Sequence, residues 1–197
     1  MNTDITERQQ EIINASLEII AESGIQSLTI KNLAKKIGFA ESALYRHYEN
    51  KIQILLAILD FFKQHSEQFF TNQLDSNENA LLKIENLFQN HFKKFSTSPS
   101  LVSVIFSEEI FRNEAELTGK VKEIMEKNIA NLKLIIETGQ SKGEIRTDVE
   151  ASYLSVMILG SLRMFVKQWH MANYNFNLTE KGSEFINSIK ILIKNKI

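Results

Sequence analysis

Residues 29–51 read TIKNLAKKIGFAESALYRHYENK and contain the signals for two short helices joined by a tight turn. Thr29 can cap the first helix with its hydroxyl, and Gly38 is suited to end it. Apolar residues recur between them at spacings of three and four, which is the pattern of a helix with one apolar face. A second helix is expected from about Glu41 to His47. Two helices in this order are typical of a helix-turn-helix, which lays its second helix into the major groove of DNA.

The stretch resembles the DNA-binding signature of the TetR family of bacterial transcriptional regulators. In that signature a threonine opens the second helix of the domain, a glycine lies in the turn, and the recognition helix ends in the pattern L-Y-x-H-aromatic-x-x-K. The resemblance extends back through residues 12–24 and covers roughly the first quarter of the chain. In this chain the pattern consists of Leu44, Tyr45, His47, Tyr48 and Lys51.

Two residues depart from the common pattern at the start of the recognition helix. Ala40 stands where a serine or threonine often caps that helix, and such a cap is typically worth ~1 kcal/mol. Glu41 is favourable at a helix N-terminus, but it would repel a nearby phosphate. These departures change the expected approach to DNA and leave the motif itself intact.

Side chains that meet DNA either position the protein on the phosphates or read the bases. The resemblance implies that Tyr45, Tyr48 and Lys51 bind the phosphate backbone. A core position is an equal alternative for Tyr48, because an aromatic residue at that offset often packs on the preceding helices. Thr29 can add its hydroxyl or the N-terminal amides of its helix. Lys31 is a further phosphate candidate, although a surface lysine is most often only solvated.

Three residues of the second helix are predicted to face the major groove: Ser42, Ala43 and Arg46. Arg46 can bind guanine through two hydrogen bonds, and Ala43 can contact a thymine methyl group. A phosphate contact is the alternative for Arg46. His47 belongs to the same predicted DNA-binding set, although packing or capping is the favoured interpretation of its side chain.

The composition favours helices and says little about nucleic acid. One proline and seven glycines in 197 residues leave few turn signals. The net charge is −1, but residues 29–51 hold five basic and two acidic residues, a local charge of +3 that suits a groove-docking face. There is no cysteine, so disulfides and thiolate metal sites are excluded. Residues 1–7 lack an apolar run and no stretch reaches 18 apolar residues, so we expect a cytoplasmic protein without a membrane partner.

Apolar periodicity and capping signals predict nine helices and no strand. Thr6 opens the first with a capping-box sequence, and the first three helices form the DNA-binding domain, residues 1–50. The fourth helix is too long for that domain, so it is expected to join it to a helical domain of residues 51–197. The later helices are expected at 51–70, from Ser76 or Asn77 to 95, from 98–99 to 110, at 114–141, from Asp148 to 169 and from Thr179 to 193.

The predicted fold is therefore all-α, with a helix-turn-helix domain, a long fourth helix and a C-terminal helical bundle. The resemblance implies that the C-terminal domain dimerises through its last two helices. The helix after Asp148 is apolar over more than one face, so a second subunit could cover one side of it. Gly160 and Ser161, in the middle of this helix, would let another helix approach closely.

Most aromatic residues lie in the C-terminal domain, where they could wall a pocket for an apolar ligand or simply fill a core. The family's C-terminal domains commonly bind small effectors, so the resemblance favours a pocket. His91 or Glu109 could orient the polar end of a ligand. The predicted lining residues, from helices four to eight, are Phe62, Phe88, His91, Phe92, Phe106, Met125, Phe165 and Trp169.

No catalytic residue, metal site or cofactor is predicted. A di-iron carboxylate bundle needs a glutamate three residues before a histidine, and the residues in that place before the four histidines are leucine, phenylalanine, phenylalanine and lysine. Neither a nucleotide-binding loop nor a G-x-S-x-G elbow occurs. A helix-turn-helix protein with an architectural or cell-division role and no small effector remains an open alternative.

The sequence therefore predicts a ligand-responsive transcriptional regulator, and a repressor by default. A homodimer would place two recognition helices ~34–36 Å apart, or a multiple of that, on a palindromic double-stranded DNA operator. A small apolar or amphipathic effector would release the DNA by favouring another conformation of the C-terminal domain.

Overall fold

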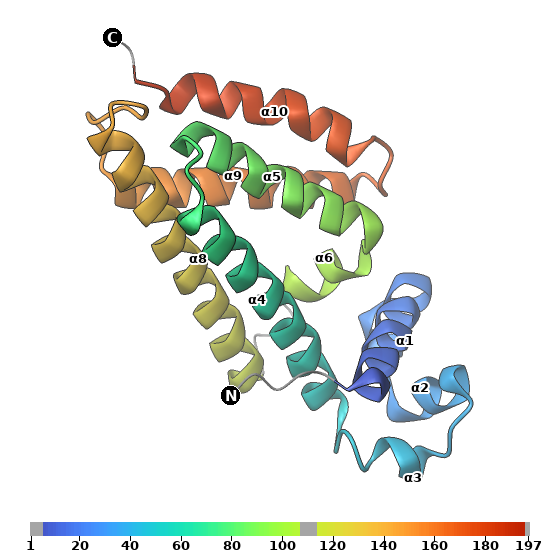
Figure 1. Ribbon diagram of the computed structural model, residues 1–197. Coiled ribbons are helices and arrows are strands. Elements are labelled where there is room, and N and C mark those ends of the chain that lie inside the picture. The colour runs from blue at the N-terminus through green and yellow to red at the C-terminus, as the bar shows by residue number, and fades with distance from the viewer. Residues whose placement is uncertain (1–5, 107–113, 196–197) are drawn as a thin grey trace. The chain divides into compact units, whose positions relative to one another are not determined.

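The computed structural model describes residues 6–106 and 114–195, and the regular structure in these ranges is helical (Figure 1). Over the described residues there are nine α-helices, one 3-10 helix and a single isolated β-bridge, which confirms the all-α prediction. None of the described helices is long and apolar enough to cross a lipid bilayer. The helices are α1 (Glu7–Ser23), η1 (Ile25–Ser27), α2 (Ile30–Ile37), α3 (Glu41–Leu44), α4 (Lys51–Asp75), α5 (Ala80–Thr97), α6 (Ser100–Ile105), α8 (Ala115–Ser141), α9 (Ala151–Met171) and α10 (Leu178–Ile193).

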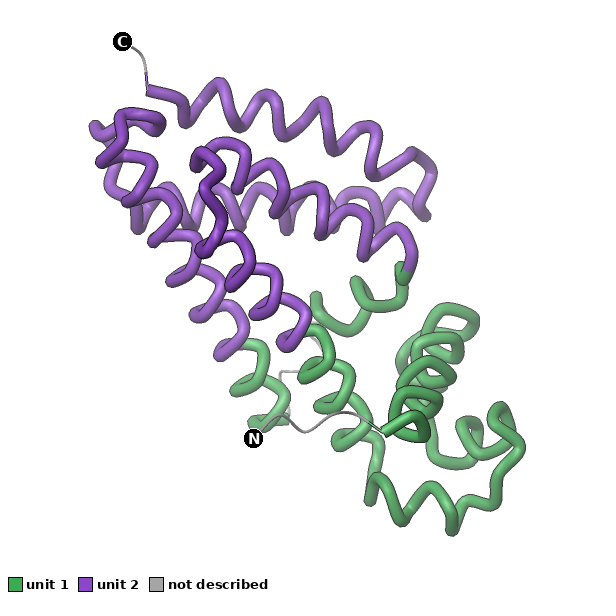
Figure 2. Tube along the Cα trace, in the orientation of Figure 1, with its two compact units in different colours: residues 1–62, 98–121 green, residues 63–97, 122–197 purple. Residues whose placement is uncertain are grey.

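The chain divides into two compact units (Figure 2). Unit 1 holds residues 1–62 and 98–121, and unit 2 holds residues 63–97 and 122–197. Helices α4 and α8 each contribute residues to both units. The functional boundary after residue 50 stays a prediction, because a division by contacts groups residues by packing and not by what they bind.

In unit 1, local signals place the ends of α1 and α2. The hydroxyl oxygen of Thr6 accepts a hydrogen bond from the Gln9 N–H, and the Gln9 side chain accepts one from the Thr6 N–H, so the predicted capping box is present. Thr29 caps α2 by accepting from the Asn32 N–H at 3.1 Å. Gly38 ends α2 in the left-handed region, with φ of +80°. The core of this unit includes Ile12, Ile13, Ile20, Leu28, Leu33 and Leu44, all at most 3% exposed.

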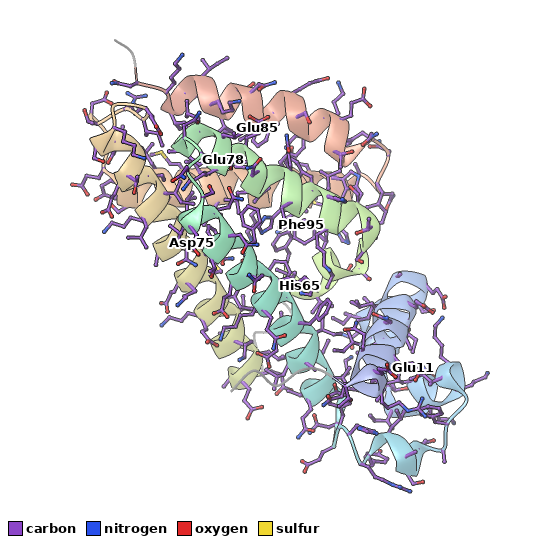
Figure 3. All side chains as sticks on the ribbon, viewed as in Figure 1. Glu11, His65, Asp75, Glu78, Glu85 and Phe95 are labelled. Carbon is purple, nitrogen blue, oxygen red and sulfur yellow. The ribbon has the colours of Figure 1, made fainter. Side chains whose placement is uncertain are left out.

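In unit 2, α5 packs against α10 and α9. The ring of Phe92 lies directly on Gly182 of α10, where an added Cβ would be 2.2 Å from a ring carbon. Only glycine allows this close approach of α10 to α5. Glu85 on α5 forms an ion pair with Lys190 on α10, and Figure 3 shows Glu85 on the side of α5 that faces α10.

Several predicted helix starts were wrong by a few residues. Helix α9 follows Glu150, which makes no side-chain cap. The predicted cap, Asp148, instead binds Arg146 with its carboxylate, through two hydrogen bonds of 2.7 and 2.6 Å. Helix α10 is capped by Asn177, two residues before the expected Thr179.

Helix α5 begins at Ala80, where Asn79 accepts a hydrogen bond from the Leu82 N–H, and not at the Ser76 or Asn77 cap that was predicted. Helix α3 ends at Leu44, short of the expected His47. The end of the predicted sixth helix and Glu109 lie outside the described residues.

Candidate functional site

The turn and short helix that follow α2 expose a set of polar side chains on the surface of unit 1. Tyr45 is 51% exposed, so its ring and phenol group are available to a partner. Ala43 is half-buried. The other exposed residues of the predicted DNA-binding set are Ser42, Arg46 and His47, and, at the start of α2, Thr29 and Lys31.

Packing holds helix α3, because its own four residues cannot. Ala40 supplies no side-chain cap, as its position in the sequence predicts. Leu44 is 1% exposed and anchors the helix in the core, and its carbonyl oxygen accepts hydrogen bonds from the His47 and Tyr48 N–H groups at 2.9 Å. Isolated helices this short are not stable in water, so the groups that project from α3 are held in place by the core beneath it.

Two contacts join α1 to the helix-turn-helix. The guanidinium of Arg8 lies 3.7 Å from the ring centroid of Phe39, which is in the turn between α2 and α3. The ammonium of Lys36 pairs with Glu22 at 2.9 Å and with Glu18 at 3.1 Å, and the hydrogen bond that it donates to Glu22 raises the pKa of Lys36 most. Lys36 therefore joins α2 to α1, and its charge is already matched within the protein.

The last two residues of the family-like pattern are not on the exposed face. Tyr48 is 7% exposed, and burial raises its pKa. Lys51 is partly buried, and its Nζ donates a hydrogen bond of 2.7 Å to the carbonyl oxygen of Ile25. Burial lowers the pKa of Lys51. The structure thus gives both residues contacts within unit 1, in addition to any contact with DNA.

Three of the predicted ligand-lining residues meet in one aromatic cluster in unit 2. The Phe92 ring centroid is 5.8 Å from that of Phe88 and 5.6 Å from that of Phe165. Phe165 stacks on Phe185 at 4.5 Å and lies 5.9 Å from Phe176. Phe88 and Phe92 are fully buried, whereas the other three rings are half-exposed. The cluster therefore reaches from the core of unit 2 to its surface.

The polar groups near this cluster are engaged in the fold. His91 is buried, and its Nδ1–H donates to the Leu87 carbonyl oxygen at 2.8 Å. Burial lowers the pKa of His91, so its ring is neutral at pH 7. The Nε1–H of Trp169 donates to the Phe176 carbonyl oxygen at 2.9 Å. The His91 bond lies within α5, and the Trp169 bond joins α9 to the segment that precedes α10.

The remaining three predicted lining residues lie on α4, at the end of α6 and on α8. Phe62 and Phe106 belong to unit 1, where Phe62 is buried and Phe106 is half-exposed. Met125 is 45% exposed on α8, with its sulfur 3.8 Å from a guanidinium nitrogen of Arg163. Phe176 and Phe185 were missed as members of the cluster. Phe185 belongs to the apolar pattern of the last helix, whereas Phe176 lies between α9 and α10, where helical spacing gives no signal.

Helix α9 also carries a line of exposed apolar residues on one face. These residues, which we call the α9 stripe, recur at spacings of three and four, as one face of a helix does. Gly160 lies within the stripe, and an added Cβ there would meet no atom within 4 Å. The stripe consists of Tyr153 (62% exposed), Val156 (55%), Met157 (62%), Gly160, Met164 (59%) and Met171 (72%).

No group of three or more histidine, aspartate or glutamate side chains that could hold a metal ion occurs in residues 6–106 or 114–195. The described residues offer exposed polar side chains in unit 1, and an aromatic cluster and an apolar stripe in unit 2.

Two family models match the chain, one for each part. The model described as "Bacterial regulatory proteins, tetR family" matches residues 12–58, and the model described as "YsiA-like protein, C-terminal region" matches residues 62–193. The chain is 26% identical over 192 residues to the fatty acid metabolism regulator protein of Bacillus subtilis (strain 168), with 96% of this chain and 97% of that protein covered.

Two further similarities span nearly the whole chain. It is 20% identical over 181 residues to the nucleoid occlusion factor SlmA of Photobacterium profundum, with 91% of this chain and 92% of that protein covered. Among solved structures, the transcriptional regulator FadR from Bacillus subtilis in complex with stearoyl-CoA matches with a TM-score of 0.77 and 25% identity, covering 93% of this chain and 96% of that one.

Proposed function

Since this chain belongs to the TetR family of bacterial transcriptional regulators, we propose that it binds its operator as a homodimer and is released by a long-chain fatty acyl thioester. The chain is a ligand-responsive DNA-binding repressor, and its relatives include transcriptional regulators. The residues that meet DNA, the dimer contact and the identity of the effector are the proposed parts.

The DNA-reading face is the exposed surface of α2, the turn and α3. Ser42, Ala43 and Arg46 read bases, with Arg46 binding guanine through its two parallel N–H donors. Tyr45 bonds to phosphate oxygens, and His47 adds a further contact beside it. Thr29 and Lys31 complete the phosphate contacts at the start of α2. The support is that all of these side chains except the half-buried Ala43 are exposed on one unit that also carries the local positive charge.

The partner on the α9 stripe is a second copy of the chain. Exposed methionines and a tyrosine in line on one helix form an apolar surface that a monomer does not keep in water. Gly160 allows the same helix of the partner to approach closely, in a contact that repeats itself about a two-fold axis. This arrangement gives the two recognition helices a fixed separation, which is what a palindromic operator reads.

The proposed effector binds along the aromatic cluster of unit 2. An acyl chain needs an apolar wall that starts at the surface and continues inward, and the cluster has this layout. The single observation that carries the proposal is the similarity over nearly the full chain to a Bacillus regulator whose structure contains stearoyl-CoA. The cluster belongs to the part of the chain that the C-terminal family model matches.

A DNA-binding titration tests this function. Fluorescence anisotropy with a duplex selected from a random pool by the wild-type protein would be measured with stearoyl-CoA, octanoyl-CoA, stearate and CoA. We expect stearoyl-CoA to weaken binding by ~5–150-fold, the usual range of allosteric coupling, and CoA alone to have no effect. Phe165→Ala should reduce the response to stearoyl-CoA and leave DNA binding without effector unchanged. Release by none of the acyl compounds would refute the proposed effector class.

The similarity to a nucleoid occlusion factor supports a second candidate function, in which the chain binds DNA at many sites without a fatty acyl effector. The two functions differ in a measurable way. A regulator of fatty acid metabolism is expected to bind few genomic sites and to leave them when acyl-CoA accumulates. A nucleoid occlusion factor is expected to stay bound at many sites under the same conditions, and chromatin immunoprecipitation distinguishes them.

A further inference from the structure

Glu41 is an acidic residue within a stretch of net positive charge. It is the first residue of α3, it stands directly before the proposed base reader Ser42, and its side chain is exposed. Residues 29–51 hold five basic residues and only one other acid, Glu49. The phosphates of DNA repel a carboxylate, so an acid on the face that enters the groove lowers the general affinity for DNA. A specific partner on the DNA would offset this repulsion.

The carboxylate of Glu41 has no partner in the part of the chain that the structure describes. By contrast, Glu49 accepts a hydrogen bond from the side-chain amide of Gln53 at 3.3 Å, and the Glu49 N–H donates to the same side chain at 2.8 Å. Within the protein, the dipole of α3 offers Glu41 a favourable interaction that needs no contact. The carboxylate can therefore bind a donor from outside without breaking a bond in the protein.

The backbone that carries Glu41 is held in place. Its carbonyl oxygen accepts the Tyr45 N–H at 3.1 Å, and the Ala40 carbonyl oxygen accepts the Ala43 N–H at 2.9 Å. Leu44, which is 1% exposed, anchors the same turn in the core of unit 1. In a helix-turn-helix, the first residues of the recognition helix contact the base edges. The carboxylate is therefore presented from a fixed position within the turn that meets the bases.

The major groove offers a carboxylate only two kinds of donor. An ionised carboxylate accepts hydrogen bonds and donates none. The donors on the base edges are the N4 amino group of cytosine and the N6 amino group of adenine, whereas guanine and thymine present acceptor oxygens. Adenine also carries the N7 acceptor beside its amino group, which would repel the second carboxylate oxygen. Cytosine is therefore the base that a carboxylate fits best.

We propose that Glu41 is a specificity-determining residue, whose carboxylate accepts a hydrogen bond from the N4 amino group of one cytosine per recognition helix. The proposal rests on the DNA-binding function above, with α3 as the helix that enters the major groove. Arg46 selects for guanine in that function. Glu41 selects for cytosine at a second position, and it selects against guanine and thymine there, because their oxygens would face its own.

Operator selection from a random pool of duplexes tests the base preference. We expect Glu41→Gln to change the preferred base at one position from cytosine to adenine, because glutamine binds the N6 and N7 atoms of adenine. Glu41→Ala should lose the preference at that position only. The matched control is Glu49→Gln, which removes an exposed acid of the same stretch, and its selected sequence should equal that of the wild type.

A modified base tests the contact itself. N4-methylcytosine carries a methyl group in place of the amino hydrogen that faces the major groove. Placed at the selected position, it should weaken binding of the wild type by about 10-fold in anisotropy titrations, as the loss of one hydrogen bond to a charged group implies. It should leave the affinity of Glu41→Ala unchanged. A role of Glu41 in the stability of α3 alone would weaken binding to every duplex equally.

Two results would overturn the proposal: the same preferred base at every position for the wild type and Glu41→Gln, or an equal effect of N4-methylcytosine on the wild type and Glu41→Ala. If Glu41→Ala does not fold, Glu41→Gln takes its place in the titrations, because it keeps the length of the side chain and removes only the charge. A wild-type protein that selects no duplex would instead refute the DNA-binding function itself.

Discussion

Replacing Gly182 by alanine should destabilise unit 2, although alanine is the better helix former. The new Cβ would lie 2.2, 2.3 and 3.0 Å from three ring carbons of Phe92, so the ring must move by about 1 Å to reach an ordinary contact. Phe92 is 1% exposed and lies between Phe88 and Phe165, which leaves no open side for that movement. Overpacking of this kind typically costs ~1–3 kcal/mol.

Gly119→Ala is the matched control, since Gly119 is also within a helix but an added Cβ there meets nothing within 4 Å. Both substitutions gain about 1 kcal/mol of helix propensity, so the difference between them isolates the packing cost. We expect Gly182→Ala to melt ~2–12 °C below Gly119→Ala, because 1 kcal/mol corresponds to ~2–4 °C for a chain of this size. Calorimetry or thermal circular dichroism measures this. Equal melting temperatures would show that the Phe92 ring moves freely and that the aromatic cluster is not closely packed.

Three further substitutions test other parts of the molecule. Met157→Lys places a charge on the α9 stripe and should convert the homodimer to monomer in sedimentation velocity; a dimer that persists would place the interface elsewhere. Arg46→Ala should cost ~1–3 kcal/mol of specific binding and relax the preference at one base pair, and an unchanged sequence preference in a selection experiment would remove Arg46 from base reading. His91→Gln should reduce the loss of stability at acidic pH. Burial lowers the pKa of His91, so the unfolded chain binds the proton more readily than the folded one. The free energy of unfolding of the wild type therefore falls as the pH drops below the unfolded pKa of ~6.5. Urea unfolding at pH 5 and pH 7 measures it, and equal pH dependence of variant and wild type would contradict the assignment.

The sequence predicted those features of the fold that depend on neighbours within one helical turn. The Thr6 capping box, the Thr29 cap and the left-handed Gly38 are such features, and the structure contains all three. The start of α9 was wrong because Asp148, a suitable cap by its type, binds the guanidinium of Arg146 instead. A choice between two partners for one carboxylate depends on tertiary structure, which spacing in the sequence does not reveal.

In the candidate site, too, local features could be predicted from the sequence and tertiary contacts could not. The exposed helix-turn-helix residues could be predicted, because they are the positions of the two short helices that do not belong to the buried apolar face. The partner of Lys51 is 26 residues away in sequence and is a backbone carbonyl, so no residue type marks it. The acidic partners of Lys36, Glu18 and Glu22, are one turn apart on α1, and this spacing was the only signal that the sequence offered.

The packing of α5 against α10 also has a consequence for biosynthesis. Glu85 and Lys190, which join these helices, are 105 residues apart. At the usual ~5–20 residues per second, a ribosome needs on the order of 5–20 s to make the chain between them. During that interval Phe88 and Phe92 have emerged but the backbone at Gly182, against which Phe92 packs, has not yet been made. The nascent chain therefore presents its most aromatic surface to chaperones before α10 can cover it, and unit 2 closes only after α10 has been made.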